Sequence, residues 1–165
     1  MAIEQKITPF LWFDSNAEEA VGFYTATFKD SRIVTRSRYG NSGPGPKGWI
    51  MAIAFRLEGQ DFVAINGGPH FKFNEAISLY VNCETQEEID RLWSKLVAGG
   101  EEHDCGWLKD RYGLSWQVVP RQLPEMLKSS DRAAAKRAME AMLKMTKIEV
   151  AELERAFAGD AVPIG

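Results

Sequence analysis

The sequence has few cysteines and no surplus of basic charge. Its two cysteines, Cys83 and Cys105, are too few for a disulfide framework and form no Cys-x-x-Cys pair, which argues against a structural zinc site. With 20 basic and 23 acidic residues, the net charge is −3, so the basic footprint of a nucleic-acid-binding protein is missing. We therefore expect a protein of a reducing compartment that does not bind DNA or RNA.

Long apolar stretches are also missing. No segment approaches the ~20 apolar residues that a membrane span needs. The N-terminus, Met1 to Lys6, lacks the basic and then apolar order of a signal peptide. These absences predict a cytoplasmic location without membrane association.

The first 70 residues read as one strand, one helix and three further strands. Asn16 and Glu19 form a capping-box-like start, and apolar residues follow at helical spacing up to Phe28. A segment rich in glycine and proline, residues 41–48, interrupts the strands. The strands are expected at residues 7–13, 31–39, 49–57 and 62–66.

The order of a strand, a helix and further strands begins again about 69 residues later. Thr85 and Glu88 form a capping box for a helix that Gly99 and Gly100 close. Strands are expected at residues 77–83, 105–108 and 114–119. The sequence thus predicts a duplicated βαβββ module.

The segment after the second module is helical. A short helix is expected at residues 123–127, a second helix after Asp131, and a third from the capping box of Thr146 and Glu149 to Gly159. One face of the second helix is apolar, and we expect it to pack against the protein body or a partner. Its residues are Ala135, Met139, Met142 and Leu143.

Three long stretches carry a family resemblance: ITPFLWFD (7–14), NGGPHFKFNEA (66–76) and CGWLKDRYGLSWQVVP (105–120). Over about residues 5–120 the chain resembles the vicinal-oxygen-chelate superfamily, which includes glyoxalase I, bleomycin-resistance proteins and extradiol dioxygenases. More narrowly, it resembles the PhnB-like branch. The resemblance implies an α+β fold in which residues 1–120 form two βαβββ modules, about 5–67 and 77–120, with a curved mixed sheet. Residues 121–165 would form a C-terminal helical extension.

Members of this branch often carry the label 3-demethylubiquinone-9 3-methyltransferase. A doubly wound methyltransferase holds its cofactor on a glycine-rich turn between the first strand and the first helix. Here that link, Phe13 to Asn16, contains no glycine. We expect no cofactor, and fold analogy is the only support for methyl transfer.

Metal-binding members of the superfamily take ligands from the first and last strands of each module. The corresponding positions in this sequence are Thr8, Pro9 or Phe10, then Val63 or Ala64, then Ile77 or Ser78, and last Gln117. Of these side chains only Gln117 is a credible ligand, and a lone glutamine binds metals weakly. We therefore expect no metal.

Aromatic side chains are the best functional indication, because they fall on or beside the strands that would line a cup. Together with a few polar groups they suit a flat or apolar small molecule. The alternative, given equal weight, is that they fill the cup as core. The candidates for ligand binding are Trp12, Asn66, Phe71, Phe73, Asn74, Trp107, Trp116 and Gln117.

Candidate catalytic groups are Cys105, Glu75 and His70. Each has an ordinary alternative: a small buried residue for Cys105, a solvated charge for Glu75, and an exposed loop residue for His70. Asp110 and His103, both expected in turns, have the same solvated alternative. A reactive thiolate at Cys105 needs a nearby cation.

Three hypotheses for function remain. The first is a metal-free small-molecule-binding protein, in the manner of the bleomycin-resistance proteins. The second is an enzyme that acts on an aromatic or quinone-like substrate, and the third is a divalent-metal lyase or dioxygenase of the glyoxalase type. Because superfamily members often dimerise, we expect a homodimer with a small-molecule ligand.

Overall fold

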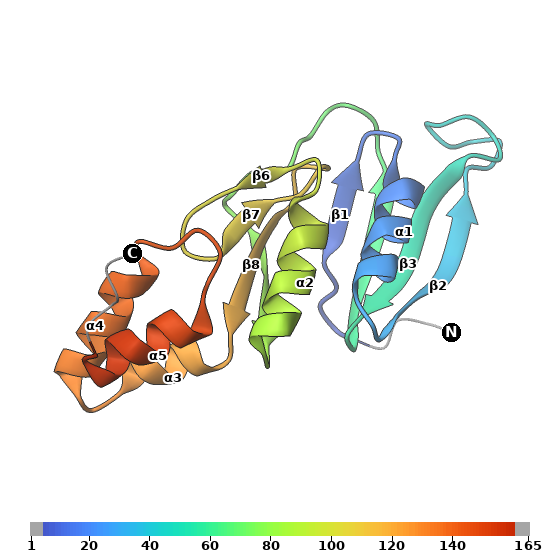
Figure 1. The fold of residues 1–165 in the computed structure, drawn as a ribbon. Coiled ribbons are helices and arrows are strands. Elements are labelled where there is room, and N and C mark those ends of the chain that lie inside the picture. The colour runs from blue at the N-terminus through green and yellow to red at the C-terminus, as the bar shows by residue number, and fades with distance from the viewer. Residues whose placement is uncertain (1–4, 161–165) are drawn as a thin grey trace. The chain divides into compact units, whose positions relative to one another are not determined.

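The computed structural model describes residues 5–160, which form two compact α+β units that divide between Phe73 and Asn74. Each unit has one four-stranded mixed sheet with a helix after its first strand, as Figure 1 shows. The predicted α+β fold of two βαβββ modules with C-terminal helices is confirmed. Within residues 5–160, no helix is both long enough and apolar enough to cross a lipid bilayer.

The first unit has strand order β1-β4-β3-β2, with β1 parallel to β4 and the other pairs antiparallel. A parallel pair needs a crossover, and α1 belongs to it. The elements are β1 (Phe10–Phe13), α1 (Ala17–Thr27), β2 (Ser31–Arg38), β3 (Ile50–Leu57) and β4 (Gln60–Asn66).

Strand alternation divides this sheet into a covered face and an open face. Phe13 on β1 and Phe55 on β3 point to the covered face, where α1 contributes Val21 and Tyr24; all four are buried. Phe10 on β1 lies on the opposite face and is exposed. One helix covers only one side of the sheet.

The start of α1 differs from the prediction. Asn16 occupies the N-cap position, but its side chain makes no capping hydrogen bond. Instead, the backbone N–H of Ala17 donates to Asn66 Oδ1 at 2.9 Å, from the end of β4. The capping-box prediction for Asn16 and Glu19 was wrong, because a partner 49 residues away satisfies this helix terminus.

The second unit repeats the arrangement, with strand order β5-β8-β7-β6 and β5 parallel to β8. The Thr85 capping box is confirmed: Thr85 Oγ1 accepts from the N–H of Glu88, and the Glu88 carboxylate accepts from the N–H of Glu84. The elements are β5 (Ser78–Cys83), α2 (Gln86–Val97), β6 (Glu101–Glu102), β7 (Trp107–Lys109) and β8 (Ser115–Pro120).

The hairpin between β6 and β7 corrects another prediction. The strand expected to begin at Cys105 begins at Trp107, because Cys105 and Gly106 have φ angles of +61° and +80°. This left-handed pair turns the chain instead of extending it. The two-residue strand β6, Glu101–Glu102, was not predicted, because its residues are both exposed and charged.

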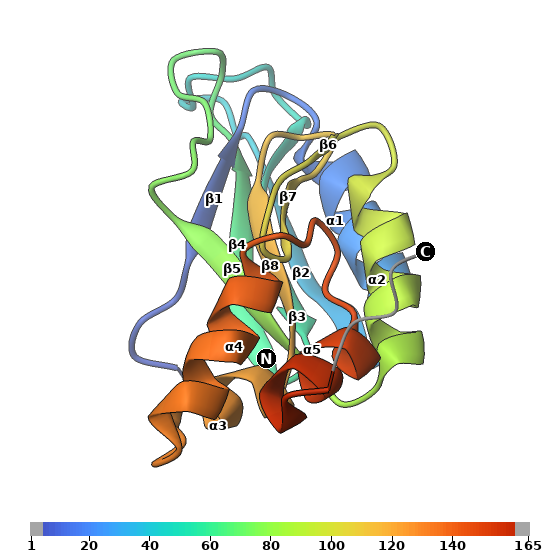
Figure 2. The ribbon, with the colours of Figure 1, turned by 60° about the vertical axis from the view of Figure 1, so that its left-hand side comes forward.

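Three helices follow β8: α3 (Gln122–Lys128), α4 (Arg132–Met142) and α5 (Val150–Ala158). Asp131 caps α4 as predicted, with Oδ1 accepting from the N–H of Ala134 at 3.0 Å. The capping box at Thr146 was wrong, because α5 begins at Val150. Figure 2 shows these helices grouped beside the C-terminal end of β8.

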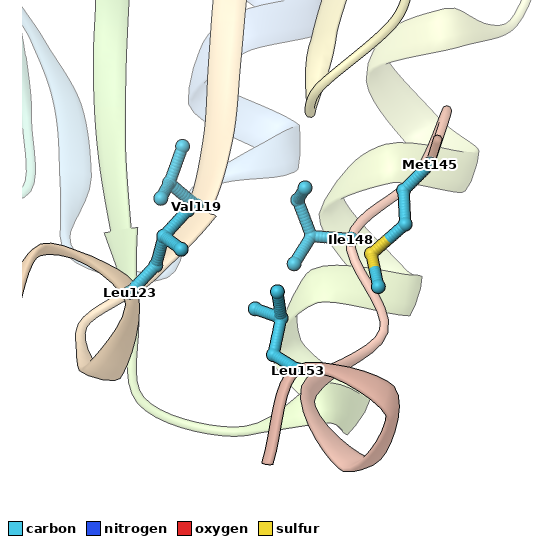
Figure 3. Close-up of a cluster of buried hydrophobic side chains, with 5 residues drawn as sticks. All are labelled: Val119, Leu123, Met145, Ile148 and Leu153. Carbon is cyan, nitrogen blue, oxygen red and sulfur yellow. The ribbon is translucent and has the colours of Figure 1, made fainter. Parts of the chain in front are cut away.

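The extension is anchored to the second module by an apolar cluster and by backbone hydrogen bonds. The cluster joins β8 and α3 to the α4–α5 segment, as Figure 3 shows; its buried members are Val119, Leu123, Met145, Ile148 and Leu153. The backbone N–H groups of Cys105 and Gly106 donate to Met145 O and Thr146 O, each at 2.8 Å. These bonds explain why Cys105 keeps a positive φ.

Gln86, in the first turn of α2, completes the attachment of the extension. Its Nε2 donates to Ile148 O at 3.1 Å, and its Oε1 accepts from the N–H of Val150 at 2.7 Å. The side chain thus caps α5 from another helix, because the N-cap residue Glu149 provides no capping bond.

Gly106 gives a direct test of this attachment. A Cβ at Gly106 would lie 2.9 Å from Val118 O and 3.0 Å from Ile148 Cγ1, whereas a Cβ at Gly48 would meet nothing within 4 Å. Both glycines have positive φ, so replacement of either by alanine lowers the free energy of unfolding by about 1–2 kcal/mol. At Gly106 the contacts of the new methyl group lower it by about 1–3 kcal/mol more.

We predict that Gly106→Ala lowers the free energy of unfolding more than Gly48→Ala, as measured by urea denaturation. Equal losses in the two variants would mean that Ile148 does not pack against Gly106 in solution.

Candidate functional site

In the second unit α2 packs on one face of the sheet, and on the opposite face the C-terminal extension packs against Val119 at the end of β8. Trp116 and Val118 on β8 point toward α2 and are buried, while Gln117 between them points the other way. Strand register places Tyr80 of β5 and Trp107 of β7 directly beside Gln117. Two aromatic rings and an amide therefore form a row on the open face.

The row continues toward the edge of the sheet. The N–H of His103 donates to Trp107 O at 2.9 Å, which extends the β6–β7 pairing by one residue and sets His103 beside Trp107. Tyr80 is 45% exposed, and the His103 side chain is 42% exposed. These side chains are accessible, unlike those on the α2 face.

A second row, with polar and charged side chains, runs parallel to the first. Ser78, Ser115 and Lys109 are register partners across β5, β8 and β7, and Glu101 pairs with Lys109 on the outer side. Gln117 Nε2 donates to Ser78 Oγ at 2.9 Å and so joins the two rows.

Charge on this face is concentrated around Lys109. Its ammonium group donates to the Glu75 carboxylate in an ion pair. That hydrogen bond lowers the pKa of Glu75 and raises the pKa of Lys109 from their usual values. His103 Nε2 lies 3.7 Å from Glu101 Oε2.

Trp116 and Asp110 belong to the core instead of the open face. Trp116 is 2% exposed, and its indole N–H donates to Asp110 Oδ2 at 2.9 Å. Asp110 Oδ1 also accepts from the N–H groups of Tyr112 and Leu114, at 2.8 and 3.1 Å. Asp110 therefore holds the β7–β8 turn, and the solvated alternative for it was wrong.

In the first unit, Trp12 lies on the open face of β1 beside the segment after β4. Its indole N–H donates to Gly68 O at 2.9 Å, and Phe71 packs edge-on with ring centroids 5.0 Å apart. A Cβ at Gly67 would lie 2.3 Å from Trp12 Cζ2, so glycine is required for the backbone to approach the indole. Phe73 instead packs on Phe13, at 5.2 Å.

Both asparagines proposed for ligand binding make structural hydrogen bonds. Besides the bond to Ala17, Asn66 donates through Nδ2 to Ile50 O at 3.0 Å. Asn74 Oδ1 accepts from the N–H of Ala76 at 2.9 Å in a local turn. A ligand would have to compete with these partners.

The other candidate residues are dispersed. Cys105 is half-buried in the turn held by the extension, and His70 is exposed between β4 and β5 in the first unit. Of the catalytic candidates, only Glu75 is brought to the open face of the second unit, through Lys109.

Sequence reasoning missed Tyr80 and Lys109 as members of this face, and it considered Ser78 only as a possible metal-ligand position and His103 only as a turn residue. The signal that points to them is the period-two pattern of β5 and β8 together with the shortness of β6 and β7. Register across three strands cannot be read from a single strand.

Comparison with known proteins adds a family to this geometry. The family model described as 3-demethylubiquinone-9 3-methyltransferase matches residues 5–119. A structure titled as a putative 3-demethylubiquinone-9 3-methyltransferase, PhnB protein, from Bacillus cereus is 44% identical, with a TM-score of 0.65. The match covers 70% of this chain and 99% of that one.

The chain belongs to the 3-demethylubiquinone-9 3-methyltransferase family, which includes the PhnB-like proteins. No curated protein matches.

More distant structures share the fold. A Pseudomonas aeruginosa protein is 22% identical with a TM-score of 0.59, over 71% of this chain and 98% of that one. A fosfomycin resistance protein from Listeria monocytogenes, whose structure is titled as complexed with Mn(II) and sulfate, is 16% identical with a TM-score of 0.54. That match covers 77% of this chain and all of the other.

The methyltransferase in the family description finds no support in the geometry of this family member. The link from β1 to α1 contains no glycine, and the first N–H of α1 is already bound by Asn66. Each sheet is mixed instead of doubly wound and parallel. The residues of this link therefore do not fit the cofactor turn of a doubly wound methyltransferase.

The metal centre of other superfamily members does not fit this chain either. On β1 and β4 the open-face positions are apolar except for Asp61, whose carboxylate is already bound by Arg56. On β5 and β8 they offer the neutral polar side chains Ser78, Tyr80, Asn82, Ser115 and Gln117. Among residues 5–160 no three His, Cys, Asp or Glu side chains cluster as metal ligands would. These neutral donors are poor ligands for a divalent ion.

The two cysteines differ in a way that thiol labelling can measure. Burial raises the pKa of Cys83 to about 12, so its thiol stays protonated at pH 8 and is inaccessible, whereas Cys105 is half-buried. We predict that in the folded protein Ellman's reagent modifies Cys105 but not Cys83.

Cys105→Ser should then label only as fast as the protein unfolds, and Cys83→Ser should label as the wild type does. Rapid labelling of Cys105→Ser in native buffer would contradict the packing of Cys83 beneath α2.

Proposed function

We propose that this chain is a metal-free small-molecule-binding protein whose ligand, flat or apolar, lies on the open face of the second sheet. The observation that carries the proposal is the accessible row of Tyr80, Gln117 and Trp107 on the face opposite α2. Aromatic faces around a hydrogen-bonding amide are the usual lining of a small-molecule site.

The two faces of this sheet support a binding role through their contrast. Aromatic and apolar side chains that serve the core, such as Trp116, are fully buried on the α2 face. Tyr80 remains 45% exposed although it is large and aromatic. Stability alone gives no reason to place such a ring on the uncovered face.

Trp12, Phe10 and Phe71 form a comparable aromatic surface in the first unit. Phe10 and Phe71 are 64% and 65% exposed. We propose that these side chains form an aromatic ligand surface of the first unit by itself, with Trp12 oriented by its bond to Gly68.

Tryptophan fluorescence tests the binding role of Trp107. We predict that neutral nitroaromatic compounds such as 4-nitrobenzyl alcohol quench the wild type saturably, because the ring stacks on Trp107. Trp107→Phe should remove most of this quenching, and excess EDTA should leave it unchanged.

Trp49→Phe is the matched control, because Trp49 is an exposed indole outside the row. Linear, unsaturable quenching that is equal in wild type and Trp107→Phe would refute the proposal.

We also propose that the protein is a homodimer. The described residues include apolar side chains exposed enough to be covered by a second copy, among them Ile7 in the first unit and Leu143 after α4. Light scattering after size exclusion should give twice the 18.5 kDa mass of one chain. Leu143→Asp should shift it toward the monomer, whereas a single-chain mass for the wild type would exclude the dimer.

A further inference from the structure

The polar row beside the aromatic row is made of hydrogen-bond donors. Ser78, Ser115 and Lys109 lie side by side across three strands. Lys109 carries a positive charge, and its side chain is 24% exposed. Ser78 Oγ already accepts a hydrogen from Gln117, so its own hydrogen is directed elsewhere. Such a row suits a ligand group that only accepts.

Ser115 is the least expected member of this row. It is 1% exposed, and its Oγ has no hydrogen-bond partner among the residues described. A buried hydroxyl without a partner destabilises a protein, and an alanine would avoid the loss. Ser115 lies between Ser78 and Lys109, where its hydroxyl can donate to an acceptor on a bound ligand.

Glu75 supplies a carboxylate to Lys109, the neighbour of Ser115 in this row. It lies on the exposed segment that leads into β5, and it binds Lys109 on β7. Because β8 lies between β5 and β7, this ion pair crosses the sheet next to Ser115. Lys109 is fixed on a strand, whereas Glu75 is on a segment without regular structure and can move away.

The charges around Lys109 favour a ligand carboxylate that replaces Glu75 over one that binds in addition to Glu75. Lys109 already has two carboxylates near it, Glu75 and its register partner Glu101. A third carboxylate would leave one cation among three anions. A ligand carboxylate that replaces Glu75 keeps the charge balance unchanged.

We propose that the ligand is an aromatic carboxylate, with its ring on Trp107 and Tyr80 and its carboxylate bound to Lys109 and Ser115 in place of Glu75. This inference rests on the proposed function and names its ligand class. Glu75 is then an internal competitor that closes the site when ligand is absent.

Three naphthalene compounds that differ only in charge test the ligand class. Calorimetric titration of the full chain uses 2-naphthoate, 2-naphthylmethanol and 2-naphthylmethylammonium. We expect 2-naphthoate to bind about tenfold more tightly than the alcohol, as one charged hydrogen bond provides. The ammonium compound should bind no better than the alcohol.

Variants test the exchange. Glu75→Gln should raise the affinity for 2-naphthoate about three- to tenfold, because the competing charge is gone, and should leave the alcohol unaffected. Lys109→Met should abolish the preference for the anion. Glu18→Gln removes an exposed glutamate paired with Arg36 at 3.4 Å in the first unit, and as the control it should change nothing.

Ser115→Ala separates a binding role from a structural one. If Ser115 binds the carboxylate, the variant loses affinity for 2-naphthoate about threefold or more while its urea midpoint stays equal or rises. A fall in the midpoint with unchanged affinity would assign Ser115 to stability and remove it from the site.

The outcomes also distinguish this inference from the proposed function. If the three compounds bind equally, or the ammonium compound binds best, the function stands and the ligand class is wrong. Lower affinity for 2-naphthoate in Glu75→Gln would likewise overturn the exchange. If none of the three compounds binds, both proposals fail.

Discussion

The structure depends on one geometric constraint: side chains alternate across a strand, and each sheet has a single helix to cover it. In both units the βαβββ order places the helix on one side, where Phe13, Phe55, Trp116 and Val118 are buried. The helix of each unit does not cover the opposite side, although some residues there, such as Ser115 and Val119, are buried by other parts of the chain. Tyr80, Gln117 and Trp107 lie on that side and can be selected for contact with another molecule. The same alternation explains why Trp116 belongs to the core, although its neighbours Ser115 and Gln117 on β8 are on the open face.

The extension is held to the second module by a different set of interactions. Gly106 has no side chain where Ile148 packs, and Gln86 bonds the backbone at Ile148 O and at the N–H of Val150. The family model ends at residue 119, and the Bacillus cereus relative is matched over 99% of its length by 70% of this chain. The residues after β8 thus lie beyond the family model, and their backbone carbonyls fix the turn that contains Cys105.

Membership of this family does not by itself determine the chemistry of the open faces. The superfamily fold supports metal chemistry where ligands project from the first and last strands of each module. Here those strands offer mainly apolar side chains, hydroxyls and amides on the open faces, and the one carboxylate, Asp61, is bound by Arg56. The fold depends on the buried core positions, while the chemistry of the open face is set by a few independent residues. A binding function that uses aromatic stacking and charge requires no change in the core.

The sequence by itself determined the fold class, the duplicated module, the helix cap at Thr85 and most strand positions, because local patterns of period two and 3.6 encode them directly. It could not determine partners that are distant along the chain. The cap of α1 comes from Asn66, the cap of α5 from Gln86, and the indole of Trp116 is bound by Asp110. Nor could it show that Ser78, Ser115 and Lys109 form one row, because that depends on register among three strands. Only the tertiary structure decided which side chains are satisfied by the core and which face outward, since hydrogen bonding and burial at each position are set by residues far away in the sequence.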